Sequence, residues 1–239
     1  MSLLPERIEA IDIGCGDGRS TLSMASKLGI TGDIVGIDKL AAKLPIGQGA
    51  PNISFAAYDA MDLPNKKLAQ IATLLNVLPG LQSAAQVQAM LRKACIVTRD
   101  FVYVAQPQFD SSAYLIRRGF KTNYSDMTAN RYQGTSYDYF RMARALMDDG
   151  LIADFALMES ERIRDSADPS IHSLQSPADS GPFDESLHRY KSDDVSFSEP
   201  IYRRFHLVLC RKAAQLLPIV KRLRAADRVE SVIYSTIPL

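Results

Sequence analysis

Short apolar runs alternate with helical patterns along the first half of the chain. Each run has the length of a strand and is bounded by turn residues, which is typical of strands buried in a sheet. The runs lie at 8–13, 33–38, 53–59, 70–77 and 100–106. Between the last two, the i, i+3, i+4, i+7 spacing of one helix face is met by Val87, Met90, Leu91 and Ala94. Strands that alternate with helices favour an α/β fold with helices on both faces of a parallel sheet.

The second half is patterned differently. Residues 135–150 predict a helix that ends at Gly150, and 151–160 and 202–210 predict two further strands. Between these strands, the polar segment 163–200 is rich in Ser, Asp and Pro, and we expect it to be a long loop insertion. The tail predicts one more helix, with Pro218 at its first position.

Composition sets limits on the class of protein. The 239 residues suffice for one full-sized domain, so we treat 1–239 as a single domain, and 46% hydrophobic with 23% charged residues is typical of a globular one. No apolar run reaches the roughly 20 residues that cross a bilayer, and no secretory signal is visible. The cysteines, Cys15, Cys95 and Cys210, are too far apart to indicate a disulfide framework or a zinc site. We therefore expect a cytoplasmic protein without membrane contact or metal.

Charge is unevenly distributed although the net charge is only +1. Residues 151–200 carry eleven acidic against four basic side chains, a balance of −7, and 201–239 carry eight basic against two acidic ones, a balance of +6. Such segments are usually solvated faces, so the pattern disfavours a nucleic-acid partner without excluding one.

The segment "AIDIGCGDGRST" (10–21) reads as a strand, a glycine turn and the start of a helix. A dinucleotide fingerprint, G-x-G-x-x-G, would need glycine at position 19 or 21, which are Arg19 and Thr21. A phosphate-binding G-K-[ST] is not present either. What remains is D-x-G-x-G-x-G, which offers bare backbone N–H groups and a helix N-terminus to a ligand.

This turn resembles motif I of the class I S-adenosylmethionine-dependent methyltransferases, and three later segments strengthen the resemblance. "IVGID" resembles the second-strand motif and ends in Asp38, "YDAMDLP" (58–64) resembles the third-strand motif, and "LLNVLPGL" (74–81) resembles the motif after the fourth strand. The likeness covers residues 7 to about 106 well, and the later strand pair by general pattern only.

The resemblance implies a Rossmann-like α/β fold: a doubly wound, mostly parallel seven-stranded sheet with an antiparallel last strand pair and helices on both faces. It also implies S-adenosylmethionine as the cofactor. The residues expected to bind it are Asp12, Gly14, Cys15, Gly16, Asp17, Gly18, Asp38, Lys39, Asp59, Ala60, Met61, Asn76 and Val77.

Residue types fit the adenosine half of that cofactor. The three glycines let the backbone approach a ligand and can take positive φ. Asp38 offers two acceptor oxygens to the paired ribose hydroxyls. As the resemblance implies, Asp59 accepts from the adenine amino group while the N–H of Ala60 or Met61 meets a ring nitrogen.

For the methionine half, Asp12, Asp17 and the backbone around Asn76 are expected to supply acceptors for the ammonium group. Turn formation also explains a strand-end Asn, so Asn76 remains open between the two roles. We interpret Asp62 as a turn former and Cys15 as a small packed residue.

The chemistry of methyl transfer limits what the sequence can identify. The leaving group is good and neutral, so the protein mainly aligns the reactants and excludes water, and a base is needed only for a protonated nucleophile. No residue is therefore assigned as catalytic.

Several acceptor classes are disfavoured. Asn76-Val77-Leu78-Pro79 does not match the [DNS]-P-P-[YFW] of DNA amino methyltransferases, and no Pro-Cys pair of cytosine C5 enzymes occurs. The segment "TLLNVLPG" lacks the clustered Asp and Asn of the metal-dependent catechol-type enzymes, and Asn76 stands where polyamine synthases carry an acidic residue. A small-molecule acceptor therefore leads. The alternatives are an RNA or protein acceptor held by the basic C-terminal segment, and a non-catalytic cofactor-binding or scaffold protein. The oligomeric state is left open.

Aromatic density offers a further clue, since ten of the nineteen Phe and Tyr residues fall in 101–140. They either wall an acceptor pocket or pack a helix against the sheet. Because little chain precedes the first strand, we expect 107–135 and 163–200 to cover the substrate in place of an N-terminal cap. Among the histidines, we interpret His206 as structural and assign no catalysis to His172 or His188.

Overall fold

The computed structural model describes residues 8–40, 52–122, 132–177, 194–226 and 229–239. The strands are β1 (Ile8–Ile13), β2 (Ile34–Asp38), β3 (Ile53–Ala57), β4 (Ala69–Leu75), β5 (Thr98–Pro107), β6 (Phe120–Thr122), β7 (Asp154–Asp165), β8 (Ile171–Ser173), β9 (Ser196–Cys210) and β10 (Val229–Ser235). The α-helices are α1 (Arg19–Leu28), α2 (Ala84–Val97), α3 (Ser112–Arg117), α4 (Ser136–Asp148) and α5 (Leu216–Ala226). Three 3₁₀ turns are η2 (Ala60–Asp62), η3 (Leu78–Gly80) and η5 (Ala213–Gln215).

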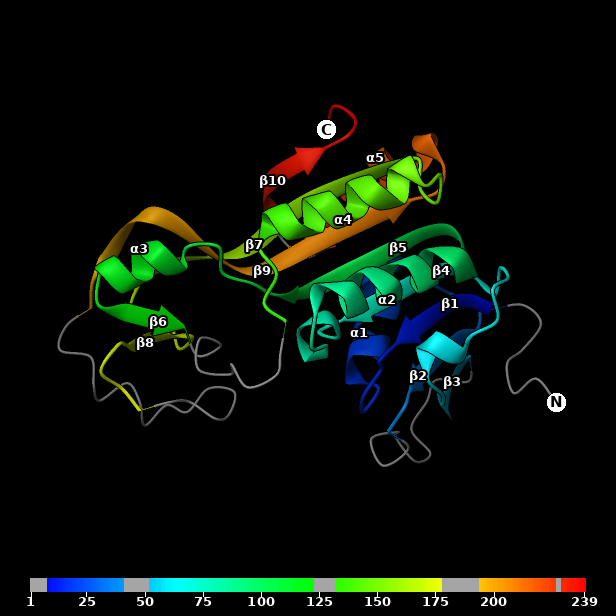
Figure 1. Cartoon of the computed structure of the whole chain (residues 1–239), viewed down its shortest axis with the longest axis horizontal. Coiled ribbons are helices and arrows are strands. Elements are labelled where there is room, and N and C mark those ends of the chain that lie inside the picture. Colours follow the sequence, from blue (N-terminus) through cyan, green and yellow to red (C-terminus); the bar gives the residue numbers. More distant parts are fainter. Residues whose placement is uncertain (1–7, 41–51, 123–131, 178–193, 227–228) are drawn as a thin grey trace.

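The main sheet has the order β10-β7-β9-β5-β4-β1-β2-β3 (Figure 1). Strands β1 to β5 pair in parallel, whereas β9 runs antiparallel to both β5 and β7. The predicted mostly parallel sheet with an antiparallel last pair is therefore confirmed. The eighth strand was not predicted: β10 pairs antiparallel with β7 at the sheet edge, where few of its residues are buried and its sequence lacks an apolar face.

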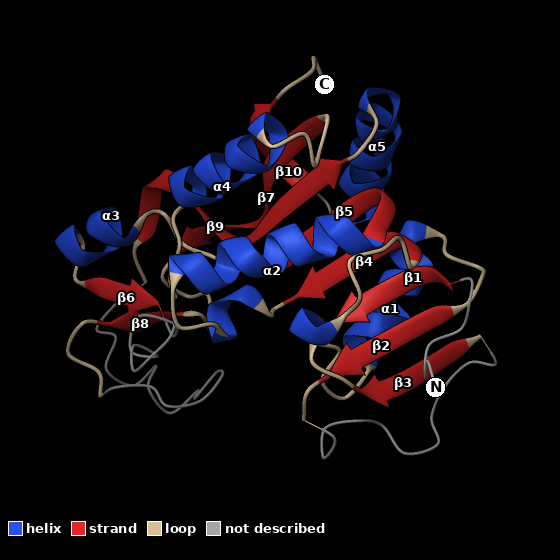
Figure 2. Cartoon of the chain, turned by 45° about the vertical axis from the view of Figure 1, so that its right-hand side comes forward, coloured by secondary structure: helices blue, strands red, loops and turns tan. Residues whose placement is uncertain are grey.

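Both faces of the sheet carry helices, as predicted for a doubly wound fold. Figures 1 and 2 show α2 and α4 side by side over one face, where Leu91 and Leu146 enter a core shared with β1, β4 and β9. On the other face, Met24 of α1 and Val220 of α5 enter a second core, which also holds residues of β1, β5, β7 and β9. Helix α5 begins at Leu216, so Pro218 is its third residue and not, as predicted, its first.

A small lobe lies beyond the ends of β5 and β7. There β6 pairs antiparallel with β8, and Tyr114, Phe120, Ile163 and Ile171 share a separate core (Figure 1). The prediction of a loop over 163–200 is therefore wrong at its described ends, because 163–165 continue β7, 171–173 form β8 and 196–200 begin β9. These polar stretches become strands because the lobe supplies partners; residues 178–193 lie outside the described part.

No helix among the described residues has both the length and the apolar character to cross a membrane.

Candidate functional site

The glycine turn follows the carboxyl end of β1, on the side of the sheet where all the parallel strands end. Gly14, Gly16 and Gly18 have φ of 74°, 56° and 80°, the left-handed region that side chains disfavour. The N–H groups of Gly14 and Cys15 donate to the carbonyl of Ile37 at 2.7 and 3.0 Å, which fixes the turn against β2. A Cβ on Gly16 would meet nothing within 4 Å, so the middle of the turn faces open space.

Asp38, at the end of β2, is held against this turn. One carboxylate oxygen accepts from the N–H of Gly16 at 3.1 Å, and the other accepts from the N–H of Leu40 at 2.9 Å. Each carboxylate oxygen has about two acceptor positions, so both oxygens can accept another hydrogen bond. The side chain is half-buried and fixed in orientation, as expected of a group that binds paired hydroxyls.

The segment after β4 closes over the turn from the other side. Asn76 has a φ of 58°, which Asn tolerates better than most residues, and its N–H donates to the Ala105 carbonyl at 2.9 Å. This backward bend directs Val77 onto the turn, where a Cβ added to Gly14 would lie 2.7 Å from Val77 Cγ2. The site residues predicted from β1, β2 and β4 thus lie together.

Asp12 has partners other than those expected. It is 1% exposed, and its two oxygens accept from the hydroxyls of Thr21 and Thr73 at 2.6 and 2.7 Å. Burial raises its pKa to about 6, although the two hydroxyl bonds act in the opposite direction. The carboxylate therefore joins β1, α1 and β4 beneath the turn, and in this conformation it does not face a ligand.

Three other expected residues differ in exposure. Cys15 is buried, and burial together with Asp12 and Asp38 raises the pKa of its thiol to about 12, so it is a packed thiol. Asp17 and Lys39 are exposed. Asp17 pairs with Arg19 at 2.6 Å, and the hydrogen bonds from Arg19 lower the pKa of this carboxyl.

At the end of β3, Asp59 is exposed and accepts from the N–H of Met61 at 2.9 Å, thereby capping the 3₁₀ turn η2. The Met61 N–H is therefore already bonded within the turn. Of the two backbone N–H groups predicted to bind the adenine, that of Ala60 is the better candidate. The capping role thus belongs to Asp59, and Asp62, expected to form the turn, is the last residue of η2.

A second polar group follows the carboxyl end of β5, and the sequence interpretation missed it. Gln106 is 2% exposed and its amide nitrogen donates to the hydroxyl of Tyr139 on α4 at 2.6 Å. Asp110 accepts from the N–H of Ser136 at 3.1 Å, where α4 begins. Burial, and next the negative charge of Asp110, raise the pKa of Glu159 on β7 to about 7. The sequence signal that could have identified this group is Gln106, a polar residue directly after the apolar run of β5.

Among the described aromatic residues of 101–140, most pack in hydrophobic cores. Phe101 and Tyr103 lie in the core under α5, and Tyr114 and Phe120 lie in the lobe core. Tyr139 packs on Phe205 with ring centres 4.9 Å apart, close to the polar group described above.

The histidine interpretation is settled for one of the three residues. His206 is fully buried between the Tyr103 hydroxyl at 2.8 Å and the Ser160 hydroxyl at 2.7 Å, which confirms a structural role. His172 is buried in β8 and contacts the carbonyl of Pro169 at 3.2 Å. His188 lies outside the described residues.

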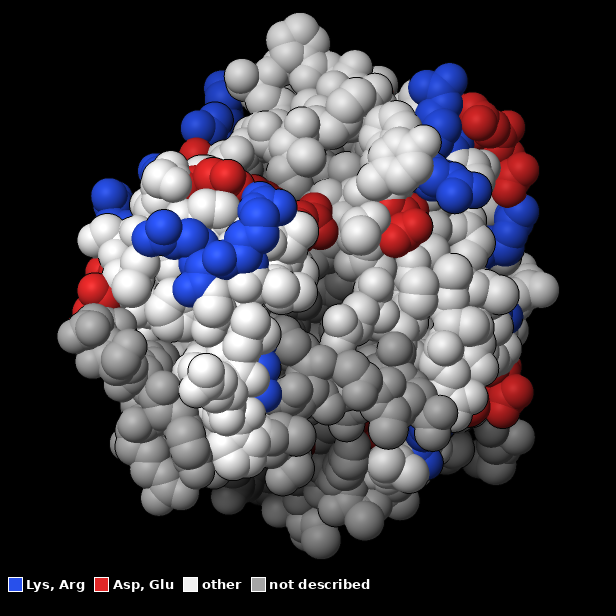
Figure 3. Space-filling view, turned by 60° about the vertical axis from the view of Figure 1, so that its left-hand side comes forward, with Lys and Arg blue, Asp and Glu red and all other residues white. Residues whose placement is uncertain are grey.

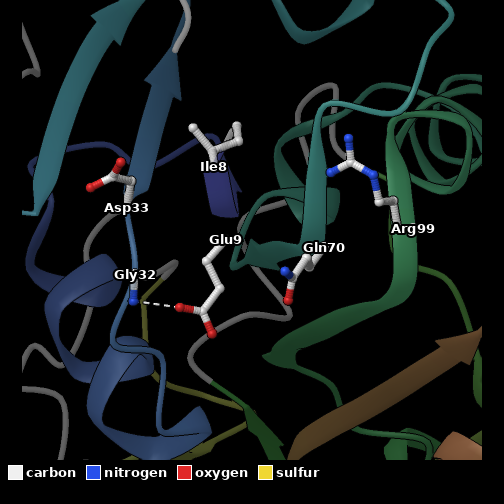
Figure 4. Close-up of a pocket in the computed structure, with 6 residues that line it drawn as sticks. All are labelled: Ile8, Glu9, Gly32, Asp33, Gln70 and Arg99. Carbon is white, nitrogen blue, oxygen red and sulfur yellow. Dashed lines mark hydrogen bonds between the residues drawn. The ribbon is translucent and has the colours of Figure 1, made fainter. Parts of the chain in front are cut away.

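A cavity of about 640 Å³ lies at the opposite edge, where the parallel strands begin (Figure 4). Its lining residues are Ile8, Glu9, Gly32, Asp33, Gln70 and Arg99. The Glu9 carboxylate is occupied by the N–H groups of Thr31 and Gly32. None of the predicted cofactor residues lines this cavity, so it is separate from the glycine turn.

Comparison with known proteins agrees with this geometry. Residues 5–146 match a family described as a methyltransferase domain. None of the curated proteins matches the chain in sequence.

Several solved structures are similar to the chain. The YcgJ protein of Bacillus subtilis has a TM-score of 0.52 at 12% identity, covering 87% of this chain and 94% of that one. The magnesium protoporphyrin IX methyltransferase of Synechocystis, solved with bound S-adenosylhomocysteine, has a TM-score of 0.45 at 15% identity, covering 86% and 74%. A methyltransferase of Haloferax volcanii in complex with the activator Trm112 has a TM-score of 0.49 at 15% identity, covering 88% and 84%.

Proposed function

The chain belongs to the methyltransferase-domain family, as an enzyme that uses S-adenosylmethionine, and from that premise we propose that it methylates a small molecule. The observation that carries the proposal is a pair of groups at the carboxyl ends of the parallel strands. One is the glycine turn with Asp38, and the other is the partly buried polar group around Gln106 and Glu159. The first suits the cofactor, and the second suits a compact acceptor.

The residues of the first group fit S-adenosylmethionine. The open space at Gly16 admits a ligand against bare backbone, and Asp38 retains acceptor positions for ribose hydroxyls. When bound, the cofactor supplies a methyl group on a positively charged sulfur that leaves as a neutral thioether. The chain needs to align an acceptor with that methyl group and exclude water. Ala60 and Asp59 lie at the end of β3, where the adenine is expected.

The acceptor would lie on the side of β5. The segment after β4 links the two groups, because Val77 lies against Gly14 and the neighbouring Asn76 donates to the carbonyl of Ala105, next to Gln106. The lobe of α3, β6 and β8 stands at the same end of the sheet (Figure 1). We propose that 107–135 and 163–200, which pair through β6 and β8, cover the acceptor.

The basic C-terminal segment gives little support to an RNA acceptor. Arg211 donates to the carbonyls of Cys95 and Leu151, Lys212 pairs with Asp100, and Arg222 donates to the carbonyl of Leu28. These cations bind the protein itself. Arg211 also follows the end of β9 that pairs with the start of β5. It therefore lies at the opposite end of the strands from the glycine turn.

The test is production of S-adenosylhomocysteine in the presence of fractionated small molecules or of RNA, with Asp38→Ala as the inactive control. We expect turnover with a small-molecule fraction and none with RNA. Turnover confined to RNA, with an affinity that falls steeply with salt, would replace this acceptor class by the nucleic acid. Cofactor binding without turnover on any fraction would favour a non-catalytic protein.

A further inference from the structure

The polar group beyond β5 has a geometry that the strand register defines. Gln106 on β5 is paired with Phe205 on β9, and Phe205 is paired with Glu159 on β7. Directly paired residues project to the same face of a sheet, so Gln106 and Glu159 flank Phe205 on the face that α4 covers. The two backbones are two strand spacings apart, about 10 Å, and the Phe205 side chain lies between them.

Tyr139 confirms this face. Its ring packs on Phe205 at 4.9 Å, and its hydroxyl receives a hydrogen bond from Gln106 at 2.6 Å. The N-terminus of the same helix, at Ser136, is fixed by Asp110, which also accepts from the Gln108 amide at 3.0 Å. Burial, and next the charge of Asp110, raise the pKa of Glu159.

Two buried polar atoms in this group lack partners within the described part of the chain. They are the Gln106 amide oxygen and the Ser136 hydroxyl, in residues that are 2% and 9% exposed. A buried polar atom without a hydrogen bond costs about 1–3 kcal/mol, and reversing the Gln106 amide would leave its nitrogen unpaired instead. The Ser136 hydroxyl belongs to the residue whose N–H contacts Asp110, and Gln106 lies on the same face as Glu159, across Phe205.

We propose that this group binds the acceptor through a primary ammonium, and that Glu159 removes its proton. The inference rests on the proposed function and names the substrate class of the same site. An ammonium has three N–H donors and no acceptor, which matches a set consisting of two carboxylates, an amide oxygen and a hydroxyl. An anionic acceptor, such as a carboxylate, would be repelled by Asp110 and Glu159.

The reaction balances in two steps. The ammonium gives one proton to the Glu159 carboxylate and becomes a neutral amine with a free lone pair. The amine nitrogen then uses that pair to form a bond to the methyl carbon, the carbon–sulfur bond breaks, and its electron pair stays on sulfur. The products are a methylammonium, S-adenosylhomocysteine and protonated Glu159, which returns its proton to water.

In Figure 3 the surface is hollowed along the middle of the view, and Asp and Glu side chains lie at the upper rim of this hollow. Asp110 is exposed and Glu159 is half-buried, so both are within reach of a ligand.

The experiment measures binding before activity. Calorimetry first tests the full chain for S-adenosylhomocysteine; saturation-transfer NMR on that complex then uses benzylamine, phenethylamine and butylamine, with benzyl alcohol and benzoate as uncharged and anionic counterparts. We expect at least one amine to bind at least tenfold more tightly than the alcohol and the acid. We expect Glu159→Gln to weaken that amine about tenfold, while S-adenosylhomocysteine affinity is unchanged.

The matched control is Glu230→Gln, an exposed residue of β10 outside both covering segments, which should change neither affinity. A second variant, Gln106→Leu, should also weaken the amine, and its melting temperature will show whether it folds. Preference for benzoate or benzyl alcohol, absence of any amine binding, or an unchanged amine affinity in folded Glu159→Gln would overturn the inference. Failure to bind S-adenosylhomocysteine would instead overturn the proposed function, and this inference with it.

Discussion

Val77 fills the space that a side chain on Gly14 would need, because a Cβ there would lie 2.7 Å from Val77 Cγ2. The two residues come from different strand ends, yet they determine together how closely the glycine turn and the segment after β4 approach each other. Glycine is required twice at position 14, once for this contact and once for a φ of 74°.

Gly14→Ala should therefore lower the free energy of unfolding by about 2–4 kcal/mol, combining overpacking with a left-handed backbone. Urea unfolding measures the change. Adding Val77→Ala should recover only the overpacking part, since the backbone strain remains. Gly80→Ala is the control, because a Cβ there meets nothing within 4 Å. Equal stability of Gly14→Ala and wild type would show that the turn adapts freely.

Asp38→Asn should weaken S-adenosylhomocysteine about 10–100-fold in calorimetry. Its carboxylate is oriented by Gly16 and Leu40, and a hydrogen bond to a charged group contributes about 1.5–3 kcal/mol. Asp33→Asn, at an exposed residue just before the opposite end of the same strand, should leave the affinity unchanged. If both variants bind like the wild type, the ribose is held elsewhere.

The parts of this protein that sequence could predict are those that short-range pattern determines. Apolar runs become the parallel strands because both faces of such a sheet are buried. The glycine turn is recognisable because positive φ and close approach demand glycine locally, whatever the rest of the chain does.

The remaining features depend on partners distant in sequence. Asp12 is buried and joins three elements because the hydroxyls of Thr21 and Thr73 donate to it. The residues next to Asp12 in sequence do not indicate these partners. Strand β8 forms in a polar segment because β6 supplies its hydrogen bonds. Gln106 and Glu159 are 53 residues apart in sequence. They lie in line across the sheet only because both are paired with Phe205 of β9.

Asp12 also makes stability depend on pH. Its folded pKa of about 6 lies above the usual 3.8, so its contribution is fully present below about pH 4 and is lost as pH rises through about 6. Two pKa units correspond to about 3 kcal/mol. Between pH 4 and pH 7, the free energy of unfolding of wild type should therefore fall by up to about 3 kcal/mol relative to Asp12→Asn. Parallel pH curves for the two proteins in urea titrations would contradict this account.

The lobe offers a test of the proposed cover. If 107–135 and 163–200 close over the acceptor, cofactor and amine together should slow protease cleavage within both segments by several-fold, since bound ligands suppress local opening. Mass spectrometry of the fragments identifies the cleavage sites. Cleavage near the N-terminus serves as the internal reference, and identical patterns with and without ligands would separate the lobe from the reaction.

The pH profile of methylation should distinguish Glu159 as a base from Glu159 as a structural residue. Burial, together with the charge of Asp110, raises the pKa of Glu159 to about 7. The residues on the adjoining elements are uncharged: Gln106, Phe205, Tyr139 and Ser231. Because the ionised form accepts the proton, the wild-type rate should rise with pH up to about 7 and then level off. In Glu159→Gln the rate should depend on free amine, so it should be about 10²-fold lower at pH 8 and keep rising towards the pKa of the amine. A Glu159→Gln profile that keeps the wild-type shape, at any rate, would show that another group takes the proton.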